Sequence, residues 1–476
     1  MKLFGIPYQP RQLYFFVGDL AAGLAAIALA HLFRLGGFPD GDELSRLPAS
    51  ALFFLSTNLI LLYLADGYNT ALDFRRAKEV VRLGLTCLVQ LALQTMMHFI
   101  LTDMWWGRGI AGLTVVCFGV VLVLWRAGIS RWRPRPLTRM RTLLVGDGDA
   151  ERVFAEAVAQ HPEYHDIYEV IGCLAYPRFG ARRGGETPIP EDVCAFGPVP
   201  VLGPVSSFKT VLSARRVDLV VVAIRGSLSS DLTRDLLEAK ARGVQIEEMP
   251  TIYKRLTGKV PIAHLNDSWL IFGPVFSGGN RFANAIQRAL DVFFALIGLF
   301  FSAPVILLAA IAVKLESAGP AFFLQERLGL NERPFWIIKL RTMGVDAEAK
   351  SGAVWSAGAA DPRVTRVGRF LRRTRVDELP QFWNVLRGDM SILGPRPERE
   401  HFVKQLKLSI PFYGLRFAVK PGVTGWAQVN YRYGATEAEA AEKLCYELYA
   451  IQELNPLLYA LTLLKTVQTM LLRPGS

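Results

Sequence analysis

Two adjacent carboxylates, Asp377 and Glu378, follow a cluster of three arginines, Arg372, Arg373 and Arg375. Nearby positive charge keeps a carboxylate ionised, so one member of the pair can act as a nucleophile while the other binds a magnesium ion. An isolated Asp-Glu pair is usually a solvated helix turn. The basic neighbours and the Leu-Pro-Gln sequence that follows favour instead a site that transfers a phosphoryl group.

Phosphoryl transfer also requires cations that hold phosphate oxygens and backbone donors in glycine-rich turns. Arg396 stands between two prolines after Gly394, and a rigidly held guanidinium can bind two phosphate oxygens, although a surface turn is the alternative. Lys339 and Arg341 lie on or beside a strand predicted at 335–340, and Arg363 follows shortly after it. Each of these three could bind phosphate or be exposed to solvent.

Seven short motifs occupy the last third of the chain. They read Ser317-Ala318-Gly319-Pro320, Gln325-Glu326-Arg327-Leu328-Gly329, Lys339-Leu340-Arg341-Thr342-Met343, Asp361-Pro362-Arg363-Val364-Thr365, Asp377-Glu378-Leu379-Pro380-Gln381, Gly394-Pro395-Arg396-Pro397 and Lys420-Pro421-Gly422-Val423-Thr424-Gly425-Trp426. Their order and spacing resemble the bacterial sugar transferases, a family of monotopic polyprenyl-phosphate phosphoglycosyl transferases, over about residues 281–472. Because several separate motifs agree in order, this resemblance is more specific than any single short pattern.

The resemblance implies that Asp377 attacks the sugar-bearing phosphate of a UDP-sugar, releases UMP, and passes the phosphosugar to undecaprenyl phosphate. It implies that Glu378 binds Mg²⁺, with Asp361 as a further metal ligand. The residues expected to bind substrate are Lys339, Arg341, Arg363, Arg372, Gln381, Gly394, Arg396 and Thr424. One departure is Tyr446-Glu447, where the family commonly has a tyrosine followed by an aspartate, so the role of Glu447 stays open.

The elements that position these residues begin with a membrane part, because 51% of the 476 residues are hydrophobic and the mean hydropathy is +0.26. Four apolar stretches are close to the roughly 20 residues that cross a bilayer. They are Leu13–Phe33, Ala49–Leu64, Val80–Leu101 and Trp106–Trp125. Basic residues follow the second and fourth stretches, which places both ends of a four-helix domain (1–130) in the cytoplasm. We expect Asp19, within the first stretch, to face the bundle interior.

The middle of the chain (131–275) is predicted to be a Rossmann-like α/β domain. Thr142–Val145 reads as a strand followed by Gly146-Asp147-Gly148, and a helix is expected over Ser229–Ala241 between strands at 217–224 and 244–248. Glu151 replaces the third glycine of the dinucleotide-binding pattern, and a partial pattern is a weak signal. Two interpretations remain open: a bound cofactor, or a structural or regulatory domain whose glycines only form a turn.

The third domain (281–476) opens with a fifth apolar stretch over 288–314, which contains Ser302 and Pro304 near its centre and is flanked by basic residues. Proline breaks the hydrogen bonding of a helix, and a true crossing would place the basic C-terminal third outside the cell. We therefore predict a re-entrant hairpin that bends at Ser302 and Pro304, with a proline-kinked span as the alternative. The fold class is thus membrane α plus α/β, with a membrane-associated catalytic domain.

The expected partners are a UDP-sugar, undecaprenyl phosphate and the lipid bilayer. A formal charge of +12 would also suit nucleic acid, but the basic residues lie among apolar anchors, which favours a membrane. Aromatic residues such as Phe322, Trp336 and Trp383 are read as core and interface anchors rather than base-stacking platforms. The sequence predicts no nucleic acid partner, allows a homo-oligomer, and indicates a multi-pass protein of the bacterial inner membrane with its catalytic domain on the cytoplasmic face.

Two other functions are compatible with part of the sequence. Four spans before a Rossmann-like unit would suit a membrane-anchored, NAD-dependent nucleotide-sugar dehydratase or epimerase, but no tyrosine has the lysine four residues later that such enzymes commonly use. An inactive scaffold for polysaccharide assembly is the other alternative. The presence of Asp377, Glu378, Lys339 and Arg396 argues against it.

Overall fold

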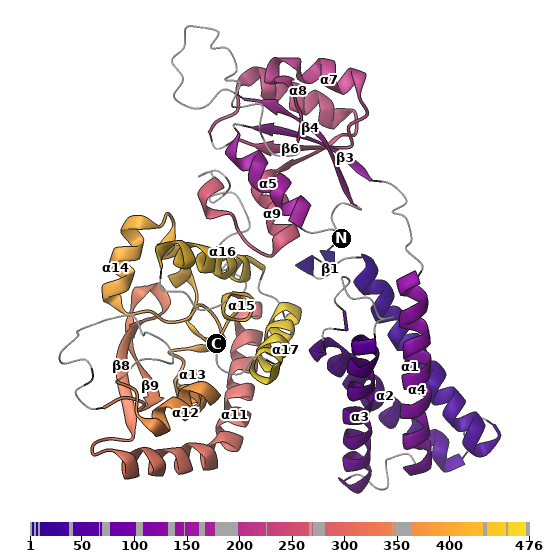
Figure 1. Ribbon diagram of the computed structural model, residues 1–476. Coiled ribbons are helices and arrows are strands. Elements are labelled where there is room, and N and C mark those ends of the chain that lie inside the picture. The colour runs from indigo at the N-terminus through magenta and orange to yellow at the C-terminus, as the bar shows by residue number, and fades with distance from the viewer. Residues whose placement is uncertain are drawn as a thin grey trace. The chain divides into compact units, whose positions relative to one another are not determined.

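The structure is a computed structural model of the whole chain (Figure 1). It describes residues 2–472 except 4–5, 8–9, 38–40, 66, 69–76, 101–107, 132–138, 147, 161–166, 177–198, 225, 266–268, 270–280, 345–346, 348–362, 432–435 and 454–455. The chain divides into two compact units, residues 1–3 with 7–137 and residues 4–6 with 138–476.

The first unit contains four long helices, which follow the two-residue strands β1 (Lys2–Leu3) and β2 (Ile6–Pro7). The helices are α1 (Pro10–Leu35), α2 (Gly41–Leu64), α3 (Ala77–Ile100) and α4 (Arg108–Arg131). Each predicted membrane span falls within one of them, apart from positions 101 and 106–107, which lie outside the described residues. Helices α1 and α3 each pack against both α2 and α4, and each of the four is long and apolar enough to cross a membrane.

The expectation that Asp19 faces the bundle interior is confirmed. Its carboxylate is buried and pairs with the buried Arg126, whose Nε lies 3.1 Å from Asp19 Oδ1. Arg126 also donates to the carbonyl of Gly67 at 2.7 Å and lies over the ring of Phe15. This charge is therefore used for packing between α1 and α4.

A five-stranded parallel sheet opens the second unit, with the strand order β5-β4-β3-β6-β7. The strands are β3 (Met140–Gly146), β4 (Tyr168–Ala175), β5 (Val201–Pro204), β6 (Leu219–Ala223) and β7 (Gln245–Glu248). Figure 1 shows α7 (Phe208–Ala214) and α8 (Ser230–Ala241) on one face, and α5 (Asp149–Gln160) and α9 (Met249–Thr257) on the other. A 3₁₀ turn, η3 (Val205–Ser207), leads into α7.

Alternating side chains of the central strands fill the two sides of this sheet. Leu143 and Val145 pack with α7 and α8, whereas Leu144 packs with α5 and α9. Successive residues of a strand point to opposite faces, so a strand that is covered on both faces reads as a continuous apolar run. The predicted Rossmann-like arrangement of strands and helices is confirmed.

The remainder of the second unit begins with one long helix, α11 (Arg281–Glu316), and an antiparallel pair of strands, β8 (Phe322–Leu328) and β9 (Pro334–Leu340). The elements that follow are η5 (Leu330–Glu332, between β8 and β9), α12 (Arg366–Thr374), η7 (Val376–Glu378), α13 (Gln381–Arg387), β10 (Ser391–Leu393), α14 (Glu400–Ser409), η8 (Tyr413–Ala418), β11 (Gly422–Thr424), α15 (Trp426–Asn430), α16 (Glu437–Glu453) and α17 (Pro456–Leu472). Strands β10 and β11 pair in parallel.

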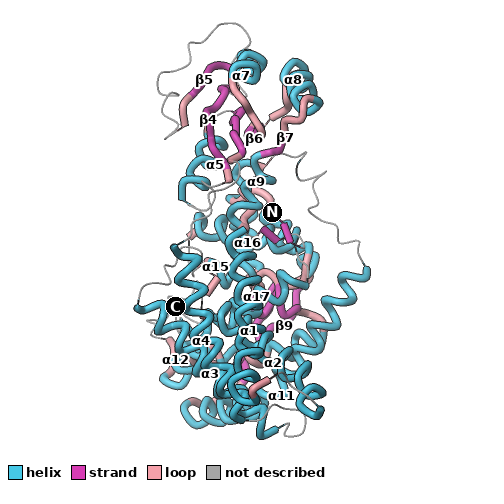
Figure 2. Tube along the Cα trace, turned by 90° about the vertical axis from the view of Figure 1, so that its right-hand side faces the viewer, coloured by secondary structure: helices cyan, strands magenta, loops and turns pink. Residues whose placement is uncertain are grey.

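Three residues that precede the predicted start of the third domain belong to its core. Val260, Ile262 in the short turn η4 (Ile262–His264), and Trp269 are buried in one cluster with residues of α14, η8 and α16. Figures 1 and 2 both show α9 next to α16. Lys254 of α9 is buried there and pairs with Glu453 of α16 at 2.7 Å. The packing therefore continues upstream of residue 281.

Candidate active site

The two carboxylates lie in a single 3₁₀ turn directly after α12. Helix α12 begins at a cap where Thr365 accepts from the amide of Gly368 at 2.9 Å, and it ends at Arg375, whose φ of 57° reverses the chain. Asp377 is 9% exposed, and the side chain of Glu378 is 15% exposed. The turn thus presents both carboxylates from a nearly buried position.

Glu378 is held by two cations from other elements. Arg396 donates from Nη2 to Glu378 Oε1 at 2.8 Å, and Lys339 Nζ lies 3.7 Å from the same oxygen. Burial alone would raise the pKa of Glu378, but the charges of Arg396 and Lys339 outweigh it and lower that pKa to about 2. Glu378 is therefore ionised at neutral pH and fixed in place.

Asp377 has a different environment from its neighbour. Burial, together with the negative charge of Glu378, raises the pKa of Asp377 to about 6, against the opposing charges of Lys339, Arg372 and Arg396. No described residue donates a hydrogen bond to its carboxylate. An ionised carboxylate without hydrogen bonds is a stronger nucleophile than a solvated one, so this environment would suit a nucleophile, whereas Glu378 is fixed by its two cations.

Lys339 reaches the pair from β9, and Asn384 of α13 holds that strand. The fully buried side chain of Asn384 donates to the carbonyl of Trp336 at 2.8 Å and accepts from the amide of Ile338 at 3.0 Å. Burial lowers the pKa of Lys339 to about 8, although Glu378 opposes this shift. Asn384 was not predicted as a site residue. The feature that could have indicated it is an amide side chain among the apolar residues of α13.

Arg396 is positioned by a close approach of two backbone segments. Gly394 donates to the carbonyl of Thr424 at 3.0 Å, and a Cβ at Gly394 would lie 2.3 Å from the carbonyl of Lys420. Glycine is therefore required for packing at this position. The carbonyl of Arg396 accepts from Nη2 of the buried Arg416 at 2.9 Å, so both the backbone and the guanidinium of Arg396 are fixed.

Of the other predicted substrate-binding residues, one acts on the pair directly. Arg372 contributes positive charge to Asp377, and its Nε donates to Thr342 Oγ1 at 2.9 Å. Arg363 precedes Val364, which pairs with Met343 in an isolated antiparallel bridge, and the carbonyl of Arg363 accepts from the amide of Gly344 at 3.4 Å. Asp361 lies outside the described residues.

Three further predicted residues make contacts that serve the fold. Arg341 is buried and donates to the carbonyls of Ala318 and Ser317 at 2.6 and 2.8 Å. Thr424 shares a 2.8 Å hydrogen bond with Thr466 of α17, and Gln381 is buried at the start of α13. The contacts of Arg341 and Thr424 are with other parts of the fold rather than with the two carboxylates.

The long helix α11 contacts the catalytic elements at both of its ends. Near its start, Arg288 donates to the last carbonyls of α13 at 2.6 and 2.7 Å, and Asp291 accepts from the amide of Ile392 at 2.9 Å. Near its end, Val313 packs with Leu340 and Leu371. Figure 1 shows a bend between these two parts. Both ends of α11 therefore lie on one globular body.

Ser302 and Pro304, the predicted bend residues, lie within α11. Proline removes the hydrogen bond that its amide would have made one turn back. The hydroxyl of Ser302 donates to the carbonyl of Leu299 at 3.5 Å. The most exposed apolar side chains near the bend are Phe300 and Phe301, at 76% and 73%.

One oxygen of the pair is available for a metal ion. Both contacts of Glu378 end on Oε1, and no described residue binds its Oε2. The described residues contain no group of three or more metal-ligating side chains. Mg²⁺ is usually held by one or two carboxylates together with substrate phosphates and water, so Glu378 fits such an ion without a further protein cluster.

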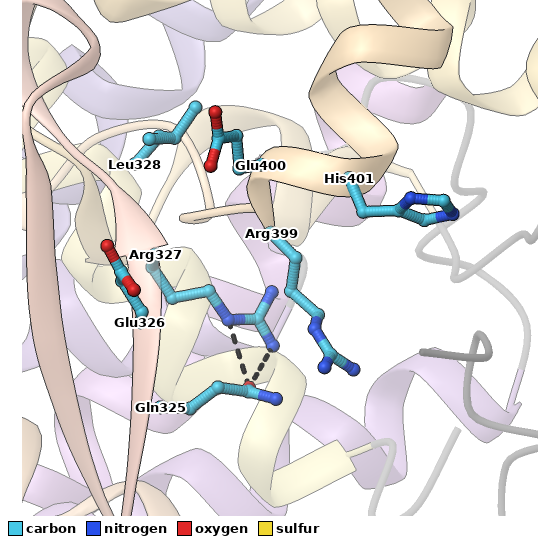
Figure 3. A pocket seen from close by; sticks show the side chains of 7 residues that line it. All are labelled: Gln325, Glu326, Arg327, Leu328, Arg399, Glu400 and His401. Atoms are coloured by element: carbon cyan, nitrogen blue, oxygen red, sulfur yellow. Dashed lines mark hydrogen bonds between the residues drawn. The ribbon is translucent and has the colours of Figure 1, made fainter. Parts of the chain in front are cut away.

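A shallow cavity of about 230 Å³ opens between the end of β8 and the start of α14 (Figure 3). Its basic lining residues are Arg327, Arg399 and His401. Arg327 donates twice to Gln325 Oε1, as Figure 3 shows, and once to the carbonyl of Pro397 at 3.2 Å. Neither carboxylate of the pair lines this cavity, but Arg399, which does, follows Arg396 by three positions.

The side chain of Glu151 fills the glycine turn that follows β3, the first strand of the Rossmann-like sheet. Glu151 is 3% exposed, and its carboxylate accepts from the amide of Gly148. A Cβ at Gly146 would lie 2.6 Å from Glu151 Oε1, so the carboxylate lies directly against the glycine turn. In dinucleotide-binding domains this is where the backbone approaches the pyrophosphate.

Comparison with known proteins gives consistent matches. The sequence profile described as "Bacterial sugar transferase" matches residues 282–473. The "UDP-N-acetylgalactosamine-undecaprenyl-phosphate N-acetylgalactosaminephosphotransferase" of Aeromonas hydrophila is 39% identical over 55% of this chain and 61% of its own length. The "Putative undecaprenyl-phosphate N-acetylgalactosaminyl 1-phosphate transferase" of Bacillus subtilis (strain 168) is 54% identical over 28% of this chain and 73% of its own length.

A third similar protein is the "UDP-glucose:undecaprenyl-phosphate glucose-1-phosphate transferase" of Escherichia coli (strain K12). It is 46% identical over 39% of this chain and 38% of its own length. The matches thus span less than two thirds of the Aeromonas and Escherichia proteins. The names of the three proteins contain two different sugars.

Proposed function

The chain belongs to the bacterial sugar transferase family, and on that premise we propose that it transfers a sugar 1-phosphate from a UDP-sugar to undecaprenyl phosphate. The products would be undecaprenyl-diphosphate-sugar and UMP, in the first membrane step of exopolysaccharide, O-antigen or capsule synthesis. The observation that supports this most directly is the pairing of a reactive Asp377 with a fixed Glu378 among Lys339, Arg372 and Arg396.

The proposed reaction has two displacement steps. In the first, a carboxylate oxygen of Asp377 attacks the phosphorus that carries the sugar, and the bond from that phosphorus to the UMP oxygen breaks. In the second, an oxygen of the lipid phosphate attacks the same phosphorus, and the bond to Asp377 breaks. Lys339 and Arg396 lie where they can stabilise the negative charge that develops on the phosphate oxygens.

Glu378 would hold Mg²⁺ through Oε2, with Asp361 as a second candidate ligand, and the ion would neutralise diphosphate charge when bound. The other roles of Glu378 follow from its contacts in the protein. Because Arg396 and Lys339 both bind its Oε1, Glu378 also aligns the two cations beside Asp377.

We further propose that α11 is a re-entrant membrane element and that the catalytic domain lies on the cytoplasmic face. The contacts of Arg288 and Asp291 at one end of α11, and of Val313 at the other, support a hairpin, because both ends bind the same body. A helix of 36 residues is about 54 Å long at 1.5 Å per residue, far more than a 30 Å hydrocarbon core requires. Exposed aromatic side chains would sit at headgroup depth: Phe322, Phe323, Trp336, Phe370 and Trp383.

The NAD-dependent alternative has less support. The carboxylate of Glu151 lies against the glycine turn and would repel the pyrophosphate of a dinucleotide. An inactive scaffold would not need Asp377 in an environment that raises its pKa. We therefore propose a structural or regulatory role for the Rossmann-like domain.

The decisive experiment measures UMP release by the purified protein with undecaprenyl phosphate and a panel of UDP-sugars, among them UDP-glucose and UDP-N-acetylgalactosamine. Without the lipid, mass spectrometry should find a phosphosugar adduct on the peptide that contains Asp377. An adduct on another peptide would refute the assigned nucleophile. Absence of UMP with every sugar would refute the function.

A further inference from the structure

Glu447, whose role the sequence leaves open, lies in a buried network that ends at the carboxylate pair. Arg416 donates to both carboxylate oxygens of Glu447, from Nε at 2.9 Å and from Nη2 at 2.8 Å. The side chains of Arg416 and Glu447 are 5% and 7% exposed. A planar, two-point contact of this kind fixes the orientation of the guanidinium as well as its position.

The same guanidinium binds the backbone next to the site. Arg416 Nη2 also donates to the carbonyl of Arg396 at 2.9 Å, and Arg416 Nη1 donates to the hydroxyl of Tyr413. Three elements meet here: α16 supplies Glu447, η8 supplies Arg416, and the segment after β10 supplies Arg396. At the other end of Arg396, Nη2 binds Glu378 Oε1 at 2.8 Å.

We propose that Glu447 is a positioning residue, which acts through Arg416 to hold Arg396 against Glu378. The inference rests on the proposed function for its kinetic consequences. Without the anion of Glu447, Arg416 would lose the carboxylate that it contacts at two points and would keep Glu398 as a nearby anion, so its guanidinium would turn toward Glu398 or recruit water. The carbonyl of Arg396 would then lose its donor, and the guanidinium would lose its alignment with Glu378.

This role predicts a kinetic signature that loss of stability alone would not give. Displacement of Arg396 withdraws a proposed phosphate ligand from the site. In Glu447→Gln we expect KM for the UDP-sugar to rise about tenfold and by a larger factor than kcat falls, because a phosphate contact that is already made in the bound substrate contributes to substrate binding.

Two variants serve as controls on the same helix. Glu447→Asp keeps the anion and should restore most of the wild-type KM. Glu453→Gln removes another carboxylate of α16, one that is 13% exposed and pairs with Lys254 rather than with Arg416. It should lower the melting temperature and leave KM unchanged.

A double-mutant comparison tests the same idea without turnover. The melting temperatures of Glu447→Gln, Glu378→Gln and the double variant should deviate from additivity by more than about 2 °C, since the two residues share Arg396 and Arg416. Glu453→Gln combined with Glu378→Gln should be additive. If no variant, including wild type, releases UMP, the proposed function fails while this thermal comparison still decides the inference.

Two results would overturn the positioning role. One is a Glu447→Gln protein that melts earlier but keeps the wild-type KM and thermal additivity. The other is a Glu453→Gln protein whose KM rises as far as that of Glu447→Gln. The first result would leave Glu447 as a purely structural residue, and the second would show that any weakening of α16 disturbs the site.

Discussion

The buried cluster around Val260 and Trp269 predicts where a minimal transferase fragment must begin. A protein that starts at residue 281 lacks Val260, Ile262 and Trp269, which are 0%, 7% and 5% exposed. Burial of each such side chain contributes about 1.5–3 kcal/mol, so their loss removes about 5–9 kcal/mol. A whole domain is stable by only about 5–15 kcal/mol. We therefore expect the fragment 281–476 to be unfolded or to melt more than 10 °C below a longer one.

The matched fragment begins at residue 258. It keeps the three core side chains, the pairing of Lys259 with Glu442, and the hydrogen bond from Trp426 Nε1 to the carbonyl of Gly258 at 3.1 Å. Thermal unfolding in detergent and UMP release should be compared for the two fragments and for a Trp269→Ala version of the longer one. Equal melting temperatures for fragments 258–476 and 281–476 would refute the reasoning, because the cluster would then contribute nothing.

Three further predictions concern the site. Asp377→Asn should abolish turnover and adduct formation, yet it should stabilise the fold at pH 7.5 by up to about 3 kcal/mol. A carboxyl whose pKa rises from 3.8 to about 6 on folding destabilises the native state increasingly from about pH 3.8 to pH 6 and fully above that range. Unfolding curves should therefore show a gain at pH 5 that is about half of the gain at pH 7.5. Asn384→Ala should lower the free energy of unfolding by about 2–5 kcal/mol, because it leaves the carbonyl of Trp336 and the amide of Ile338 unpaired. UMP release should also fall as Lys339 shifts. An unchanged melting temperature would show that Asn384 does not hold β9. Gly368→Ala should lower the free energy of unfolding by about 1–3 kcal/mol and reduce turnover, because the added Cβ would lie 2.1 Å from the carbonyl oxygen of Thr342. Gly344→Ala is the control and should have little effect, because a Cβ at Gly344 would meet no atom of the described residues within 4 Å.

Local patterns in the sequence were sufficient for elements of the sheet. The strand predicted at Thr142–Val145 lies within β3, and the helix predicted at Ser229–Ala241 corresponds to α8. The apolar period and the turn residues that define such elements are contained in short windows. Lys339 and Arg396 were expected to bind phosphate, and their convergence on Glu378 became visible only in the structure.

The supporting contacts were not predictable in this way. Asp291 binds the amide of Ile392 from 101 positions away, and Arg416 meets Glu447 across 31 positions. A lone buried charge in an apolar helix signals only that a partner exists, and the partner depends on how distant elements pack. Arg341 shows the opposite error, because a basic residue in a phosphate-binding motif is used to hold the Ser317–Ala318 turn.

The ion pair between Asp19 and Arg126 has a consequence for biogenesis. The two residues are 107 positions apart, so at a synthesis rate of about 5–20 residues per second Asp19 is made roughly 5–20 s before its partner. In the proposed four-span topology the first helix carries an unpaired acid during that interval, which costs about 2.5–3.5 kcal/mol at the centre of a membrane. We therefore expect α1 to stay beside the insertion machinery until α4 emerges. Release of the bundle into lipid would then be coupled to completion of its last helix.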